Sequence, residues 1–205
     1  MRPKIQELFS KLFNNDEITK SFDGILEACQ CYDRQVYINE ITEETGDALD
    51  NAIRFWNAVD DEQGTPYEER KPIKIYINSP GGSLTGTFTI INAIEMSKTP
   101  VYTINTGTAY SGGFFIFIAG HKRFAYPLSS FLFHEGSVGN GGTASQFANF
   151  AAFYKTQLKQ LKQVVLKYTK IDEDKYKEIQ KDDFWLTANE ALELGVCDII
   201  TEEFV

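Results

Sequence analysis

The chain has 205 residues, of which 42% are hydrophobic and 24% charged, and its formal net charge is −9. This size allows one domain with a full core, and the acidic balance excludes nucleic acid as the main partner because no Lys/Arg stripe could neutralise phosphates. The longest apolar run, residues 114–119, is too short to cross a bilayer and no secretory leader opens the chain, so we expect a cytoplasmic protein without a membrane partner.

The N-terminal third predicts a helical arm, a strand and a helix. An amphipathic pattern over the first 20 residues opens the arm, residues 1–33, which we expect to pack on a neighbouring subunit or to remain a loosely held terminus. Residues 34–38 predict a strand, and residues 42–59 predict a helix that Thr42 caps. The charged stretch 60–72, which contains glycine and proline, predicts an exposed loop.

The middle of the chain alternates between strands and helices. Residues 73–77 and 101–105 predict short strands, each followed by small or glycine residues and then a helix. Such alternation predicts parallel strands with right-handed crossovers, and sheets of this kind bind ligands beyond the carboxyl ends of their strands. We therefore expect Gly81, Gly82 and Ser111 at one edge of the sheet.

The last third contains one unusually long helix. Two short strands, residues 123–126 and 131–134, precede a Gly-rich loop, and residues 143–168 then follow a helical pattern. A helix of this length measures about 39 Å at 1.5 Å per residue, which exceeds the core of a small domain. It indicates a projecting helix that packs against another subunit. The remaining predicted elements are helices at 172–180 and 187–194 and a strand at 196–200.

The cysteines do not form a recognisable metal site. The chain has an odd number of cysteines, which are Cys29, Cys31 and Cys197, and their spacing matches no zinc-ligand pattern. We interpret them as reduced thiols and expect neither a metal nor a cofactor.

Ser111 is the candidate nucleophile. It stands in TGTAYSGGFFIFIAG (106–120), between a predicted strand and a predicted helix. Unpaired N–H groups at a helix start can stabilise an oxyanion beside such a serine. A buried serine that merely caps the helix would explain the same residues, and this stretch alone does not decide between the two roles.

A serine nucleophile requires a base, and the chain has two histidines. His134 ends an apolar run before the Gly-rich loop and is a better candidate than His121, which lies in a polar turn. No histidine follows His134, and this excludes the order Ser, acid, His of α/β-hydrolases. The candidate acids include Asp172, Asp174, Asp182, Asp183 and Asp198. Asp182 and Asp183 stand out because they adjoin the apolar residues FWL and should lie at a buried edge, but the residues alone do not separate them.

Four segments together resemble the ClpP family of serine peptidases in order and spacing. They are INSPGGS (77–83), GTAYSGGFFIFIAG (107–120), FLFHEG (131–136) and DDFWLTANEALELGVCD (182–198). The resemblance covers about residues 34–201. It implies an α/β fold in which residues 34–205 form a ClpP/crotonase-like core of repeated β-β-α (spiral) units, with a projecting handle helix at about residues 143–168.

The resemblance also implies a catalytic site. Ser111 aligns with the nucleophile of that family, His134 with the base and Asp183 with the acid. The backbone N–H groups of Gly82 and Gly112 align with the oxyanion hole.

Three neighbours of these positions depart from the family's motifs. Tyr110, Gly112 and Glu135 stand where the family usually has Ala, Met and Gln. The resemblance implies an endopeptidase that cleaves unfolded proteins or peptides inside a homo-oligomeric ring chamber, in one or two stacked heptameric rings, with an AAA+ unfoldase as a candidate partner. The departures leave the alternative of a catalytically weak or inactive ClpP-like assembly or regulatory subunit.

Two other enzyme classes fit the residues less well. A crotonase-type acyl-CoA enzyme would share the fold and the oxyanion hole, but it requires no Ser–His pair at these positions. A Ser–Lys peptidase would need Lys122 as its base, and Lys122 lies in an exposed turn.

Overall fold

The computed structural model describes residues 31–139 and 141–205. The predicted N-terminal arm therefore lies almost entirely outside the described residues. None of the helices in the described ranges combines the length and the apolar character that a bilayer crossing requires.

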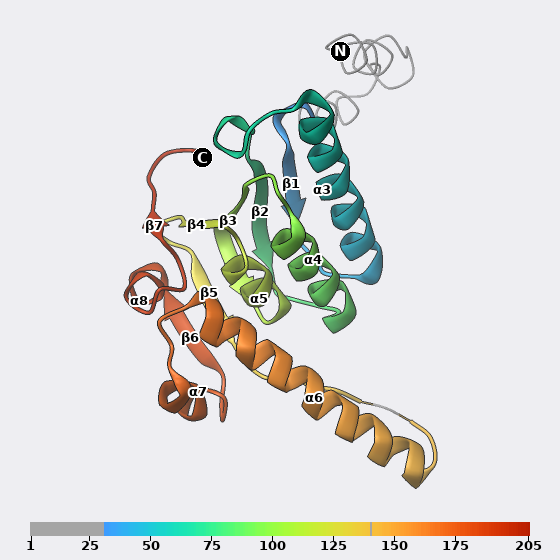
Figure 1. Ribbon diagram of the computed structural model, residues 1–205. Coiled ribbons are helices and arrows are strands. Elements are labelled where there is room, and N and C mark those ends of the chain that lie inside the picture. Colours follow the sequence, from blue (N-terminus) through green and yellow to red (C-terminus); the bar gives the residue numbers. More distant parts are fainter. Residues whose placement is uncertain (1–30, 140) are drawn as a thin grey trace, which may run out of the picture.

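A seven-stranded sheet forms the centre of the fold (Figure 1). β1, β2, β3, β4 and β7 lie side by side and run parallel, while β5 pairs parallel with the end of β3 and antiparallel with β6. The strands are β1 (Gln35–Ile38), β2 (Ile73–Ser79), β3 (Val101–Tyr110), β4 (Lys122–Ala125), β5 (Ser130–Phe133), β6 (Phe184–Thr187) and β7 (Ile199–Ile200). The predicted α/β class with parallel strands is confirmed.

Helices cover the sheet and extend from it. In the view of Figure 1, α4 and α5 lie in front of β2 and β3, and α3 packs beside α4. The helices are α3 (Glu43–Gln63), α4 (Leu84–Met96), α5 (Gly112–Ile118), α6 (Ala144–Tyr168), α7 (Glu173–Ile179) and α8 (Ala188–Glu193), with one 3₁₀ turn, η1 (Tyr67–Glu69).

Side-chain caps determine where several helices begin. The N–H group of Thr45 donates to Thr42 Oγ1 at 3.1 Å, as the sequence predicts for the start of α3. Thr143 and Thr187 each form a capping box, with Gln146 and Glu190 respectively. Each box satisfies two backbone donors that would otherwise be unpaired.

α6 projects from the body of the protein (Figure 1). Only Leu161 and Val165, near its C-terminal end, are buried in the described chain. They pack on a core that includes Phe114, Phe117, Phe131 and Phe133, all of which are fully buried. The predicted long helix is therefore confirmed, and its N-terminal half extends beyond the core.

The strands differ from the prediction at three places. β3 continues past residue 105 to Tyr110, because β4 pairs with its first half and β5 with its last three residues. β6 was not predicted, and it forms by pairing with β5, more than 50 residues earlier in the chain. The last strand is only Ile199–Ile200, which pair with the end of β4.

The prediction of an exposed loop over residues 60–72 is wrong at its start. α3 continues to Gln63, and Asp60 on its last turns is only 3% exposed. The carboxylate of Asp60 accepts two hydrogen bonds from the guanidinium of Arg34, both at 2.7 Å, and a third from Thr99 Oγ1 at 2.7 Å. A charged side chain is buried here because a cation distant in sequence pairs with it.

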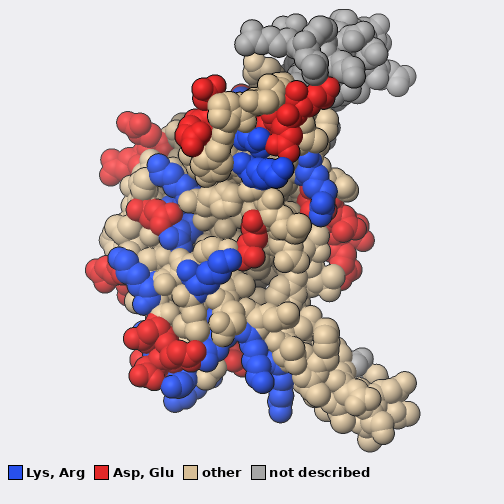
Figure 2. Space-filling view, in the orientation of Figure 1, with Lys and Arg blue, Asp and Glu red and all other residues tan. Residues whose placement is uncertain are grey.

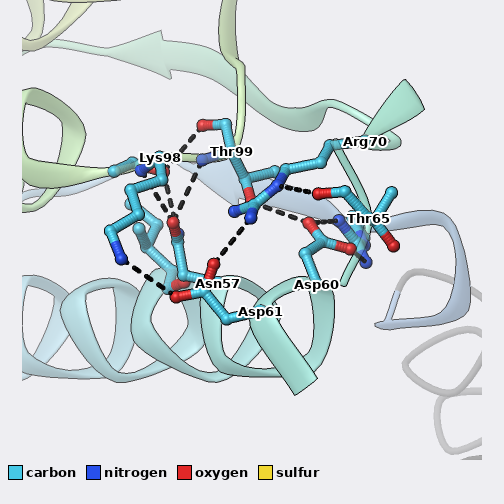
Figure 3. A network of polar contacts seen from close by, with 10 residues as sticks. Asn57, Asp60, Asp61, Thr65, Arg70, Lys98 and Thr99 are labelled. Atoms are coloured by element: carbon cyan, nitrogen blue, oxygen red, sulfur yellow. Dashed lines mark hydrogen bonds and ion pairs between the residues drawn. The ribbon is translucent and has the colours of Figure 1, made fainter. Parts of the chain in front are cut away.

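Neighbouring polar groups extend this contact into a network (Figure 3). Arg70 donates to Asp61 at 2.6 Å and to the carbonyl of Thr65 at 3.0 Å. Asn57 Oδ1 accepts from the N–H groups of Lys98 and Thr99 at 2.7 and 3.0 Å. The network joins the end of α3 to the turn between α4 and β3, so it positions β3, which leads to Ser111.

The network shifts the ionisation of Asp60. Burial alone would raise the pKa of this carboxyl, but hydrogen bonds from Arg34 and Thr99 and the charges of Arg34 and Arg70 hold the pKa below its ordinary value. The ionised carboxylate is therefore the form that stabilises the folded chain.

We predict that Asp60→Asn lowers the free energy of unfolding by about 3 kcal/mol at pH 7, because it leaves Arg34 buried without its counter-charge. The contribution of the carboxylate is complete above the unfolded-state pKa of about 3.9 and is lost as the pH falls through the lower pKa of the folded state. The difference between the two proteins in urea denaturation should therefore shrink below about pH 4.

Asp50→Asn is the matched control, because Asp50 lies on the same helix and pairs with the exposed Arg54. It should change stability much less. Equal losses in both variants would contradict a special role for Asp60.

Candidate active site

Ser111 lies between β3 and α5, as the sequence predicts, in a strained conformation. Its φ of 52° is one of two positive values among the described non-glycine residues. Its N–H group donates to the carbonyl of Leu132 at 2.9 Å, and its own carbonyl accepts from the N–H groups of Phe114 and Phe115. Backbone strain of this kind costs about 1–3 kcal/mol and is found at functional sites.

The hydroxyl of Ser111 does not cap the helix that follows. Ser111 occupies the N-cap position of α5, but its side chain makes no capping hydrogen bond. The geometry of this turn therefore does not support the alternative in which Ser111 serves only as a helix cap.

The two Gly-rich turns meet at one edge of the sheet, as expected. Gly81 lies so close to Ser111 that a Cβ atom added to it would be 2.7 Å from the Ser111 Cβ. Gly82 forms a bridge with Ile41, in which Ile41 donates to the carbonyl of Gly81 and accepts from Ser83. A Cβ atom on Gly82 would be 2.1 Å from the Ile41 carbonyl oxygen, so only glycine fits this position.

This bridge does not use the N–H group of Gly82. Within the described ranges, the N–H group of Gly82 donates to no acceptor. Gly112 is the first residue of α5, and N–H groups in a first helical turn have no partner within the helix. Two backbone donors are thus available beside Ser111.

The register of β5 and β6 brings His134 and Asp183 together. Phe133 is opposite Phe184 in this antiparallel pair, so the next residue along β5 faces the residue that precedes β6. His134 Nδ1 and Asp183 Oδ1 are 3.3 Å apart. The side chain of Asp183 is 57% exposed, so the expectation of a buried edge is wrong for this residue.

A cleft of about 490 Å³ contains both Ser111 and His134. Gly82 and Gly112 also line it, as do side chains from α4, α5 and α6. Within the described ranges no hydrogen bond joins the Ser111 hydroxyl to His134. Such bonds are often long in enzymes without substrate.

The other candidate residues lie elsewhere or have other partners. His121 Nδ1 accepts from the N–H group of Val101, at the far end of β3 from Ser111. Asp172 caps α7, Asp174 pairs with Lys177 and Asp198 pairs with Arg123. Lys122 lies over the rings of Tyr102 and Phe124, outside the residues that line the cleft.

Of the unusual neighbours, Tyr110 has definite side-chain partners. The hydroxyl of Tyr110 is 2.7 Å from that of Ser130, and its ring packs edge-on against Trp185. These contacts tie the end of β3, just before Ser111, to both β5 and β6. His134 contacts Asp183 through Nδ1, and Glu135 forms no ion pair with any described cation.

Sequence reasoning missed Thr87, which is fully buried beneath Gly112. Thr87 Oγ1 donates to the carbonyl of Ser83 at 2.8 Å. A Cβ atom on Gly112 would be 2.4 Å from this oxygen and 3.1 Å from Ile41 Cδ1. The space that a side chain at position 112 would need is therefore occupied, and no local pattern in the sequence reveals this contact.

We predict that Gly112→Ala lowers the free energy of unfolding by about 1–3 kcal/mol through overpacking. Adding Thr87→Ala removes Oγ1, the atom that the new methyl group would meet. The loss of unfolding free energy in the double variant should therefore be smaller than the sum of the losses in the two single variants. Gly139→Ala is the control, because no heavy atom lies within 4 Å of the added Cβ atom. Thermal unfolding of the wild type, the two single variants, the double variant and the control checks the prediction, and strict additivity would contradict direct contact.

Comparison with known proteins identifies the family. The model of the Clp protease family matches residues 65–204, which is more than half of the chain. Proteolytic subunit 2 of the ATP-dependent Clp protease of Cutibacterium acnes is 35% identical over 162 residues, which cover 78% of this chain and 73% of that protein. The ATP-dependent Clp protease proteolytic subunit of Bacteroides thetaiotaomicron is 30% identical over 195 residues, with 89% of each chain covered. The matched residues include Ser111, His134 and the β5–β6 pair, and the chain belongs to the Clp protease family.

Proposed function

We propose that this chain is a serine endopeptidase that cleaves peptide bonds in unfolded proteins or peptides. The observation that carries the proposal is the position of Ser111. It lies in a strained turn, its hydroxyl caps no helix, and it shares a cleft with a histidine that contacts a carboxylate. The names of the relatives, which are Clp protease proteolytic subunits, support the same activity.

Each group has a role in the proposed mechanism. His134 accepts the proton of Ser111 Oγ as the oxygen attacks the substrate carbonyl carbon, and later gives it to the leaving amine. Asp183 holds the imidazole through Nδ1 and offsets the charge that His134 gains. The N–H groups of Gly82 and Gly112 receive the oxyanion of the tetrahedral intermediate.

The chain should work as a homo-oligomeric ring. No charged residue occurs from Gly136 to Tyr154, and Figure 2 shows the projecting end of α6 without Lys, Arg, Asp or Glu. Phe147 and Phe153 on this helix are 54% and 60% exposed in the single chain. Large apolar side chains in an uncharged projection indicate a protein interface, and we assign it to contacts between subunits of one or two heptameric rings.

The setting of the activity follows from the relatives and the composition. The relatives are named as subunits of ATP-dependent proteases, so we propose that an AAA+ unfoldase delivers substrates to the ring. We place the protein in the cytoplasm, because Cys31 and Cys197 are free thiols and cysteines are expected to be reduced there.

A second candidate function is that of a catalytically weak or inactive subunit that assembles with an active homologue. The observation that favours it is that the Ser111 hydroxyl makes no hydrogen bond to His134 among the described contacts. Glycine at position 112 in place of the family's usual methionine favours it further.

We predict that Ser111→Ala abolishes cleavage of casein and of a fluorogenic peptide, with a loss of at least about 10³-fold. A fluorophosphonate probe should label the wild type at Ser111 and leave the variant unlabelled. Assembled wild-type rings that neither take the label nor cleave either substrate would refute the peptidase and favour the inactive subunit.

Asp183→Asn should reduce kcat by about 10²–10⁴-fold, because the imidazole loses the carboxylate that orients it. Asp182→Asn is the matched control, since it removes the neighbouring carboxylate and the same charge. The kcat of both variants on one peptide checks the assignment. Similar effects of the two changes would show that the acid is misassigned.

Phe153→Glu should shift the protein from rings to smaller species in light scattering, because it places a charge within the apolar interface. Gln160→Glu adds the same charge to an exposed position beyond the uncharged stretch and should leave the mass unchanged. Rings of full mass in the Phe153→Glu variant would contradict the proposed interface.

A further inference from the structure

The cleft beside Ser111 has an unusual charge content. Its walls are mostly apolar, with Phe115, Leu132, Phe150 and Leu161 among them. Among the described residues that line the cleft, Glu135 alone carries a carboxylate, and none is Lys or Arg. None of the described cations forms an ion pair with Glu135. The cleft therefore contains one carboxylate without a counter-charge.

The fold holds Glu135 in this place. It follows His134 at the end of β5, and its backbone carbonyl accepts a hydrogen bond from the Tyr154 hydroxyl at 2.9 Å. This bond ties the start of the Gly-rich loop to α6, and both residues line the cleft that also contains Ser111. The backbone of Glu135 is thus fixed to α6 where it lines the cleft.

The charge of Glu135 raises the pKa of two tyrosines. Burial raises the pKa of Tyr154, and the neighbouring charge of Glu135 raises it further. The pKa of Tyr176 is raised to about 12, mainly by burial and in addition by Glu135. The carboxylate therefore lies within electrostatic reach of phenols on both α6 and α7, in surroundings where a charge is only partly screened.

Lysine and arginine side chains match both features of this cleft. Their aliphatic stems pack on apolar surfaces while their charged heads reach a polar partner. A carboxylate without a counter-ion forms strong, charge-assisted hydrogen bonds to such heads.

We propose that Glu135 makes this cleft a subsite for peptide segments that carry Lys or Arg next to the bond presented to Ser111. The aliphatic stem packs on the apolar wall and the cationic head pairs with the Glu135 carboxylate. The term subsite rests on the proposed peptidase function, whereas the recognition itself requires no hydrolysis.

The test measures binding without turnover. The full-length Ser111→Ala protein is titrated into fluorescent, end-blocked hexapeptides that differ only at one central residue, which is Lys, Nε-acetyl-lysine or norleucine. We expect the Lys peptide to bind about tenfold more tightly than the two neutral peptides, as is typical of a hydrogen bond between charged groups. Equal affinity for the three peptides would overturn the proposal.

A second change assigns the effect to Glu135. Adding Glu135→Gln, which keeps the shape and removes the charge, should reduce the preference to within about twofold. Adding Glu193→Gln, a change of the same charge on the exposed face of α8, should preserve it. Equal losses from both changes would show that the overall negative charge attracts the Lys peptide, and would overturn the proposal.

Hydrolysis of the same peptides by the Ser111 protein separates this proposal from the peptidase function. Preferential binding of the Lys peptide without cleavage of any peptide would support the subsite and refute the peptidase. Cleavage of all three peptides at equal kcat/KM, with equal affinities, would support the peptidase and overturn the subsite.

Discussion

The register of β5 is the constraint on which the candidate site depends. On one side β5 pairs with the end of β3, and this pairing continues into the hydrogen bond from Ser111 to Leu132. On the other side it pairs with β6, and this register places His134 opposite Asp183. A slip of one residue would turn every side chain of β5 to the opposite face. One four-residue strand therefore determines where Ser111, His134 and Asp183 lie relative to one another.

The core supplies the rigidity that this alignment requires. All residues of α5 are buried, and rings of this helix pack against Phe131 and Phe133 of β5 at centroid distances of 5.0 to 5.8 Å. A positive φ at Ser111 persists only if its surroundings hold it. The buried helix α5 and the strand β5 both pack next to this turn. The free energy of this apolar packing therefore offsets the strain at Ser111.

Much of this fold follows from local patterns, and the exceptions have a common cause. The strand–helix alternation, the Thr42 cap of α3 and the place of Ser111 between strand and helix are all predictable, because each depends on residues close in sequence. β6 and the burial of Asp60 are not, because their partners, β5 and Arg34, lie far away in sequence. Local pattern also does not separate the candidate acids Asp182 and Asp183, since only the β5–β6 register brings Asp183 to His134.

The position of Thr87 beside Gly112 also restricts which residues position 112 can accept. Thr87 fills the space that a side chain at position 112 would need. A methionine at position 112, as is usual in the family, would meet the Thr87 oxygen, so a smaller residue at position 87 should lower the cost of that change. The two positions should therefore be coupled, so that the cost of a change at one depends on the residue at the other.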